Sequence, residues 1–131
     1  MNIEQTYKLS VVTRDIEKII NNSKSLTRKY NKITEVHISE TQYIDQSLKY
    51  IYQRLFNIIC YLKFDTEEYE IIKEVVQTLS DVINEKQDVY SYSVISRNEE
   101  TKYTTNRKGH VLGILEWALD YIVGNIEVED V

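Results

Sequence analysis

The chain has 131 residues, of which 42% are hydrophobic and 28% charged, and its formal net charge at pH 7 is −5. This composition predicts a single helical domain over residues 1–131, and the negative charge disfavours a dedicated nucleic-acid coat protein. Proline is absent and glycine occurs only three times, which favours long helices. Cys60 is the only cysteine, and no segment resembles a membrane span or a signal peptide. We therefore expect a cytoplasmic protein without disulfides or membrane contact.

The first predicted element is a helix that starts at about Ile3 and reaches the low thirties. Its apolar residues recur every three or four positions, as on one face of a helix: Leu9, Val12, Ile16, Ile19, Leu26, Tyr30 and Ile33. Ser23 interrupts this face, and short polar side chains compete for backbone hydrogen bonds, so the pattern allows one long helix or two short ones. Residues 33–39 alternate weakly and fit either a short strand or a linker.

The strongest pattern lies in residues 44–64 and predicts a central helix, capped by Ser39 or Thr41. Its apolar stripe consists of Ile44, Leu48, Ile51, Leu55, Ile58 and Leu62. Four further residues widen this apolar face, namely Tyr52, Phe56, Ile59 and Cys60. A helix that is apolar over so much of its circumference has to be covered from several sides, so the other helices are expected to pack around it.

A third helix is expected after a tight connection at Asp65 and Thr66. Its apolar stripe is Tyr69, Ile72, Val76, Leu79 and Ile83. Acidic residues in its first turns suit the helix dipole, and we interpret Glu67, Glu68, Glu70 and Glu74 as a solvated face. Because the connection is short, this helix should run antiparallel to the central one.

Residues 88–105 change character, because β-branched and aromatic residues alternate with polar ones and predict a β-hairpin. A last helix should begin near Lys108, with Asn106 or Thr105 as its cap, and end near Gly124. Its expected apolar face is Val111, Leu115, Leu119 and Ile122.

Together these elements predict a mostly α fold, an antiparallel bundle of three to four helices with a β-hairpin inserted before the last helix. The acidic tail, residues 125–131, is expected to be frayed. Residues 1–64 carry a net charge of +4 and residues 65–85 carry −6, which we interpret as charge complementarity between packed helices.

The sequence offers little of the chemistry that catalysis needs. His37 and His110 are the only histidines, and neither has a carboxylate or cysteine at the spacing of a metal site. Glycine-rich phosphate loops and nucleophile motifs are absent, and we interpret Cys60 as a small core residue. We therefore expect neither an enzyme nor a cofactor or metal site.

A basic run in the first helix breaks the usual charge pattern, because Lys24, Arg28 and Lys32 recur every four residues with no acid between them. Like charges at this spacing repel each other on a helix, so an anionic group is expected to face them. The alternatives are the acidic third helix, in particular its face at residues 67–74, a protein partner, or a phosphate backbone.

A second basic group lies at the start of the last helix, where Arg107, Lys108 and His110 surround Gly109. Cations at this end oppose the helix dipole, whereas free backbone N–H groups beside them suit an anion. The group fits either ordinary surface charge or an anion site.

The passage KYTTNRKGHVLGILEWALDYI, with the hairpin before it, resembles the wing and last helix of winged-helix regulators. The resemblance is confined to this passage, because a winged helix has a helix-turn-helix before its wing, whereas residues 67–85 form one unbroken pattern. It implies a DNA-binding regulator that uses residues 88–110. The anion-binding or nucleic-acid-binding residues would then be Lys24, Arg28, Lys32, Arg97, Lys102, Arg107, Lys108 and His110.

The missing catalytic parts favour a non-enzymatic regulatory, inhibitory or accessory protein that binds a partner protein, with nucleic acid as the second choice. Three helices can close a core among themselves, which would leave apolar surface of the fourth uncovered. Trp117, Leu119 and Tyr121 are the expected partner-binding residues on that helix, and a homodimer through them is the simplest closure. The protein also has eleven tyrosines, which fit helix rims or an interface.

Overall fold

The computed structural model describes residues 1–30 and 40–127, and it places their side chains except at 24–30, 40 and 41. The described elements, in chain order, are α1 (Ile3–Tyr30), α2 (Glu40–Ile59), α3 (Glu67–Asn84), β1 (Val89–Ser96), β2 (Glu99–Asn106) and α4 (Arg107–Asn125). The prediction of a mostly helical bundle with a β-hairpin before the last helix is confirmed.

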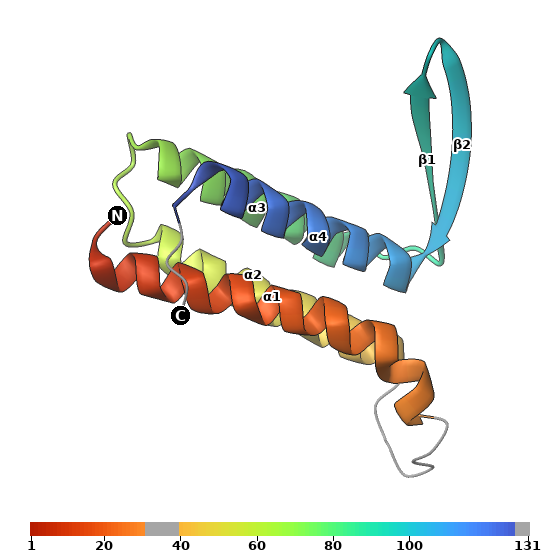
Figure 1. Cartoon of the computed structure of the whole chain (residues 1–131), viewed down its shortest axis with the longest axis horizontal. Helices are drawn as coiled ribbons and strands as arrows, with labels where there is room; N and C mark the ends of the chain where they lie inside the picture. Colours follow the sequence, from red (N-terminus) through yellow and green to blue (C-terminus); the bar gives the residue numbers. More distant parts are fainter. Residues whose placement is uncertain (31–39, 128–131) are drawn as a thin grey trace.

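The four helices run alternately up and down, and the hairpin rises from the end of the bundle where α3 stops and α4 begins (Figure 1). Helix α2 packs against each of the other three helices, as expected of a central helix, but α4 does the same. In the described part of the chain, α1 and α3 occupy the remaining diagonal and do not touch. The last helix is therefore as much a part of the interior as α2.

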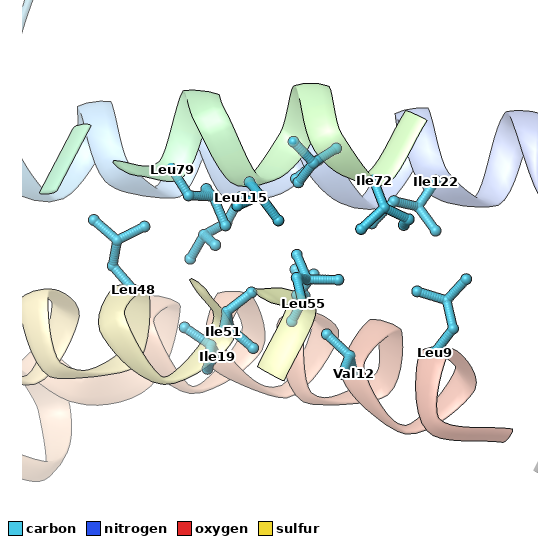
Figure 2. Close-up of a cluster of buried hydrophobic side chains, with 14 of the residues drawn as sticks. Leu9, Val12, Ile19, Leu48, Ile51, Leu55, Ile72, Leu79, Leu115 and Ile122 are labelled. Atoms are coloured by element: carbon cyan, nitrogen blue, oxygen red, sulfur yellow. The ribbon is translucent and has the colours of Figure 1, made fainter. Parts of the chain in front are cut away.

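The core fills the space between all four helices, and its side chains point inward from both layers of the bundle (Figure 2). Its fully buried members include Leu9, Ile16, Ile44, Leu48, Ile51, Leu55, Ile72, Leu79, Leu115 and Ile122. The predicted stripe of α2 is thus confirmed from Ile44 through Ile58, with Leu62 half-buried. Burial of each such side chain contributes about 2 kcal/mol, which is the main favourable term in folding.

In α3 and α4 the residues that are buried differ slightly from those of the predicted apolar stripes. In α3 the buried residues include Val75 and Val82, whereas Tyr69 and Ile83 are half-buried. In α4 the fully buried small residue Ala118 takes the place that the pattern gave to Leu119, which is half-buried. The prediction assigned the larger hydrophobic residues to the buried stripe. In the structure, a residue is buried when its position on the helix faces the close-packed core, whatever its size.

Several predicted boundaries need correction. Helix α1 continues through Ser23 as one helix, and α2 ends at Ile59 rather than at residue 64. Cys60 therefore lies beyond the helix and is exposed, so the prediction that it is a core residue is wrong. Helix α2 begins at Glu40, which places Thr41 inside the helix instead of at its cap. The other predicted cap, Ser39, and the strand or linker at residues 33–39 lie outside the described residues.

At α4, the predicted N-terminal cap is confirmed, whereas the predicted C-terminal end is wrong. Asn106 caps the helix, because its side-chain Oδ1 accepts a hydrogen bond of 2.9 Å from the backbone N–H of Gly109. Gly124, expected to end the helix, lies inside it, and the chain leaves the helix at Ile126. The Ile126 side chain is buried in the core, so this part of the expected frayed tail is anchored.

The basic run of α1 does not meet the acidic face of α3. Residues 24–30 are the last turns of α1, whereas residues 67–74 are the first turns of α3, and the two segments lie at opposite ends of the bundle (Figure 1). The expected pairing between them is therefore wrong, because α1 and α3 run in the same direction and lie diagonally apart. Lys32 lies outside the described residues.

Candidate functional site

The hairpin has the geometry of a tight two-residue turn. Its turn residues, Arg97 and Asn98, both have left-handed backbone conformations with φ of 53° and 64°. Two such residues in a row form a type I′ turn, whose twist matches that of the flanking strands. The strands pair antiparallel over eight residues each, and Tyr92 lies directly opposite Tyr103. These two rings stack with their centroids 5.5 Å apart.

Almost the whole hairpin is exposed, and it projects away from the bundle (Figure 1). Only Tyr90 is buried, and Thr105 opposite it is half-buried. The exposed apolar and aromatic residues are Val89, Tyr92, Val94, Ile95 and Tyr103, of which Ile95 is 76% exposed. An isolated two-stranded hairpin is marginally stable in water, so its position depends on the contacts at its base.

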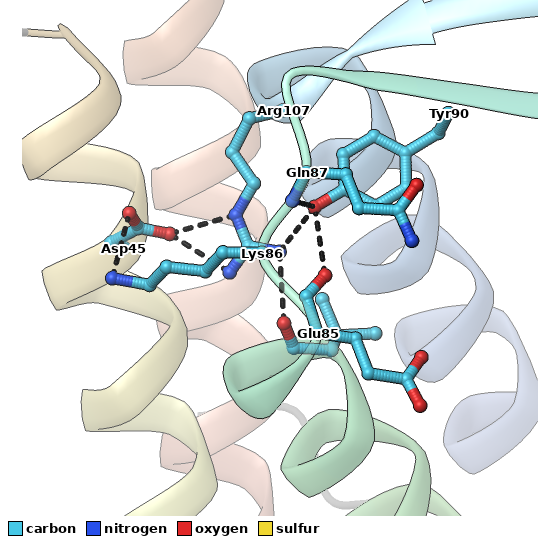
Figure 3. A network of polar contacts seen from close by, with 7 residues as sticks. Asp45, Glu85, Lys86, Gln87, Tyr90 and Arg107 are labelled. Carbon is cyan, nitrogen blue, oxygen red and sulfur yellow. Dashed lines mark hydrogen bonds and ion pairs between the residues drawn. The ribbon is translucent and has the colours of Figure 1, made fainter.

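Arg107, the first residue of α4, is the centre of those contacts (Figure 3). Its Nε donates a hydrogen bond of 3.0 Å to Oδ1 of Asp45 on α2. Its Nη1 donates to the backbone carbonyl of Val82 on α3 and to the hydroxyl of Tyr90, both at 2.8 Å. Its Nη2 also lies 3.0 Å from Asp45 Oδ1, at ion-pair distance but without hydrogen-bond geometry. One buried guanidinium thus joins α2, α3, α4 and the hairpin.

The hydroxyl of Tyr90 extends this network into the segment between α3 and β1 (Figure 3). It accepts a hydrogen bond from the backbone N–H of Gln87 at 2.8 Å and donates one to the backbone carbonyl of Glu85 at 3.0 Å. With the bond from Arg107, this hydroxyl makes three hydrogen bonds. Such a buried network favours one geometry, because each broken bond would leave a further polar group without a partner, in addition to Arg107 Nη2.

His110 completes the base of the hairpin from the side of α4. Its ring stacks on the ring of Tyr90 with a centroid distance of 3.9 Å and an interplanar angle of 6°. Burial lowers the pKa of His110 below its usual value of 6.5, and the nearby Arg107 guanidinium lowers it further, against a smaller opposite effect of Glu85. The imidazole is therefore held in its neutral form against the tyrosine ring.

This arrangement predicts that acidification weakens the fold through His110. A lowered pKa means that the unfolded chain binds the proton more readily, so stability is fully present above pH 6.5 and falls as the pH drops below that value. The midpoint of urea unfolding should therefore decrease between pH 7.5 and pH 5.5. His110→Asn should flatten this dependence, and parallel curves for the two proteins would contradict it.

The structure separates the residues predicted to bind an anion. Arg107 is 7% exposed, and its Nε and Nη1 are hydrogen-bonded within the protein, so it is not an ordinary surface charge. Its role in binding an anion stays a prediction. Lys108 and His110 share the first turn of α4 with it and are half-buried. Arg97 and Lys102 lie on the exposed hairpin, away from that turn.

The residues predicted to bind a partner on α4 lie at the rim of the bundle instead of on a free face. Trp117, Leu119 and Tyr121 are all half-buried, and the Trp117 and Tyr121 rings stack with centroids 5.4 Å apart. The Tyr121 hydroxyl donates a 2.6 Å hydrogen bond to Oε2 of Glu74, which raises the pKa of Tyr121. Because α4 packs inside the bundle, the reason for expecting a homodimer through this helix is removed.

Two residues of the network at the base of the hairpin could not be predicted from the sequence. Asp45 follows an apolar position of α2 and looks like an ordinary surface acid, and Tyr90 looks like any other tyrosine of a strand. Both become part of a site only because Arg107 reaches them across the fold. Gly109 is needed here too, because a Cβ at this position would collide with Oγ1 of Thr105 where β2 passes into α4.

The described residues also bear on metal binding, membrane crossing and the presence of hollows. Among them, no three His, Cys, Asp or Glu side chains gather so that they could hold a metal ion. None of the described helices is both long enough and apolar enough to cross a membrane. A hollow of about 390 Å³ lies between the base of the hairpin and α4, lined by Tyr90, Tyr92, Thr105, His110 and Gly113 among others.

Comparison with protein-family models, curated proteins and solved structures found no match to this chain. The fold and the geometry at the hairpin are therefore the basis for any statement about function.

Proposed function

We propose that this chain is a non-enzymatic regulatory or accessory protein that acts by binding a partner protein, and that the hairpin contacts the partner. The observation that carries the proposal is the exposed apolar and aromatic surface of an element that the bundle does not need for its core. Tyr92, Val94 and Tyr103 lie on one face of the hairpin and are each about half exposed, at 52%, 45% and 46%. Tyrosine at exposed positions supplies a large, rigid contact area at low entropic cost.

The anchor at the base supports the same proposal. A free hairpin would have to be ordered when it binds, and that ordering would reduce the affinity. Here Arg107 and the Tyr90 hydroxyl tie the hairpin to α2 and α3 through a buried network. The binding surface is thereby held in place before the partner arrives.

The charges of the hairpin favour a protein over a nucleic acid as the partner. Arg97 and Lys102 are balanced by Glu99 and Glu100, so residues 89–106 carry no net positive charge. Phosphate backbones are bound mainly by clusters of cations, and Arg107 is already paired with Asp45. A DNA-binding role through the hairpin therefore has little support among the described residues.

The proposal is tested by capture of partners from a lysate of the source organism, using wild type, Tyr103→Ser and Tyr61→Ser. Tyr61 is 71% exposed and serves as the matched control, because the connection between α2 and α3, to which it belongs, lies at the opposite end of the bundle from the hairpin (Figure 1). We expect a protein that wild type and Tyr61→Ser retain and Tyr103→Ser loses, with unfolding curves unchanged among the three. Absence of any such protein would contradict the proposal.

A DNA-binding measurement distinguishes a protein partner from the nucleic-acid alternative. Binding to duplex DNA at low salt should be undetectable if the hairpin contacts protein. Binding that weakens steeply with salt, and that Arg97→Ala with Lys102→Ala reduces, would favour nucleic acid instead.

A further inference from the structure

The outer edge of β1 is an unprotected sheet edge. The sheet has only two strands, so one side of β1 pairs with β2 and the other pairs with no strand in the described part of the chain. Strand β1, with the sequence VYSYSVIS, contains no charged residue and no proline. Soluble proteins usually protect such edges with charges, prolines or a covering element, and an exposed edge without them is a template for another strand.

The register of the hairpin shows which backbone groups point outward from this edge. Ser96 and Glu99 flank the two-residue turn and form its hydrogen-bonded pair. Bonded and non-bonded pairs alternate along an antiparallel ladder, so Tyr92 and Val94 bond to β2. The outward N–H and C=O groups then belong to the alternate residues Val89, Ser91, Ser93 and Ile95.

The sequence of β1 is nearly symmetric about Tyr92. A two-fold antiparallel pairing centred there would place each residue before Tyr92 opposite the residue equally far behind it in the second copy. Ser91 would then face Ser93, Tyr90 would face Val94, and Val89 would face Ile95. Polar residues meet polar ones and apolar residues meet apolar or aromatic ones at every level. The outward backbone groups also meet each other, because residues 89, 91, 93 and 95 pair among themselves in this register.

The surroundings fit the same arrangement. Helix α4 contacts the hairpin at its base, on the Tyr90 face, where His110 stacks on that ring. In this register Arg97 at the tip of one hairpin would face Gln87 at the base of the other, and Asp88 would face Ser96, so no like charges oppose each other there. The opposite edge of the sheet carries Glu99, Glu100 and Lys102 on β2, which discourages further strand addition.

We propose that the chain forms a two-fold homodimer in which the β1 strands of two copies pair antiparallel about Tyr92 into a four-stranded sheet. Tyr92 and Tyr103 of both copies would form one row of four aromatic rings across that sheet. The interface is small, so the dimer is weak and depends on concentration. This inference does not depend on the proposed function, and its test uses the purified protein alone.

The rate of disulfide formation between two copies tests the register in which their β1 strands pair. Cys60 is exposed and is first replaced by serine, after which Tyr92→Cys and Val94→Cys are compared. Position 92 faces itself across the axis with a Cα separation of about 4.5 Å, within disulfide reach, whereas the two copies of position 94 lie about 13 Å apart. We expect Tyr92→Cys to form covalent dimers at least about tenfold faster than Val94→Cys. Equal rates would overturn the proposal.

The second test compares the dimerisation of two charged double variants, measured by sedimentation equilibrium over a range of concentrations. Ser91→Lys with Ser93→Lys places like charges opposite each other twice in the dimer, whereas Ser91→Lys with Ser93→Glu places opposite charges there. The two variants differ only at position 93, and because Ser93 faces Lys102 across the hairpin, both are made with Lys102→Gln so that the hairpin itself changes little between them. We expect the second to dimerise with a Kd about tenfold lower than the first. Equal behaviour, or a wild type that stays monomeric at about 0.5 mM, would overturn the proposal and leave the β1 edge to a strand of another protein.

Discussion

Replacing Arg107 with methionine is expected to lower the free energy of unfolding by about 3 kcal/mol, the lower end of the range for breaking a buried ion pair. The substitution leaves the carboxylate of Asp45, whose side chain is 16% exposed, with only the longer contact to Lys86 at 3.6 Å. It also removes the donor to the carbonyl of Val82 and one of the donors to the Tyr90 hydroxyl. Urea unfolding followed by circular dichroism measures this loss.

Two comparisons show whether the loss comes from the buried pair. Lys86→Met removes the other cation beside Asp45, but its side chain is 57% exposed, so its cost should stay below about 1 kcal/mol. Asp45→Leu combined with Arg107→Met should cost less than the sum of the two single substitutions, because it leaves no unpaired buried charge. If Arg107→Met is as mild as Lys86→Met, the network is not the anchor described above.

The second large effect is expected in the core, where Leu55→Ala should cost about 2–5 kcal/mol. Leu55 is fully buried in the middle of α2, the helix that all other helices contact, so the cavity cannot be filled by a small shift of one neighbour. A domain of this size has only about 5–15 kcal/mol of stability in total. The unfolding midpoint should therefore fall clearly below that of wild type.

Gln53→Ala is the matched control for this experiment, since Gln53 lies on the exposed side of the same helix. Its effect should stay within about 0.5 kcal/mol, as for most surface substitutions. A melting curve for Leu55→Ala that coincides with that of Gln53→Ala would show that the centre of the core lies elsewhere.

Much of this fold could be predicted because its signals are local. The three-and-four spacing of apolar residues follows from the geometry of one helix, and the alternation in residues 88–105 follows from that of one strand. Asn106 caps α4 through a contact three residues away, which is also a local feature. Such signals correctly gave the order and type of the elements, while their ends shifted by several residues at α2.

The candidate site is different, because its decisive contacts join distant parts of the chain. Arg107 bonds to Asp45, which lies 62 residues earlier, and no spacing rule links two such positions. From the sequence alone, a cation at a helix N-terminus fitted either an ordinary surface charge or an anion site, whereas the fold buries that cation against a carboxylate of another helix.

The sequence by itself therefore determined the helices, the hairpin and their order, because each depends on the periodicity of a short segment. Only the tertiary structure decided that α4 lies inside the bundle, that Cys60 lies outside the core, and that Arg107 anchors the hairpin. Those features depend on which faces of distant segments meet. Packing density and the need to pair buried charges settle that choice, and both act only once the chain has folded.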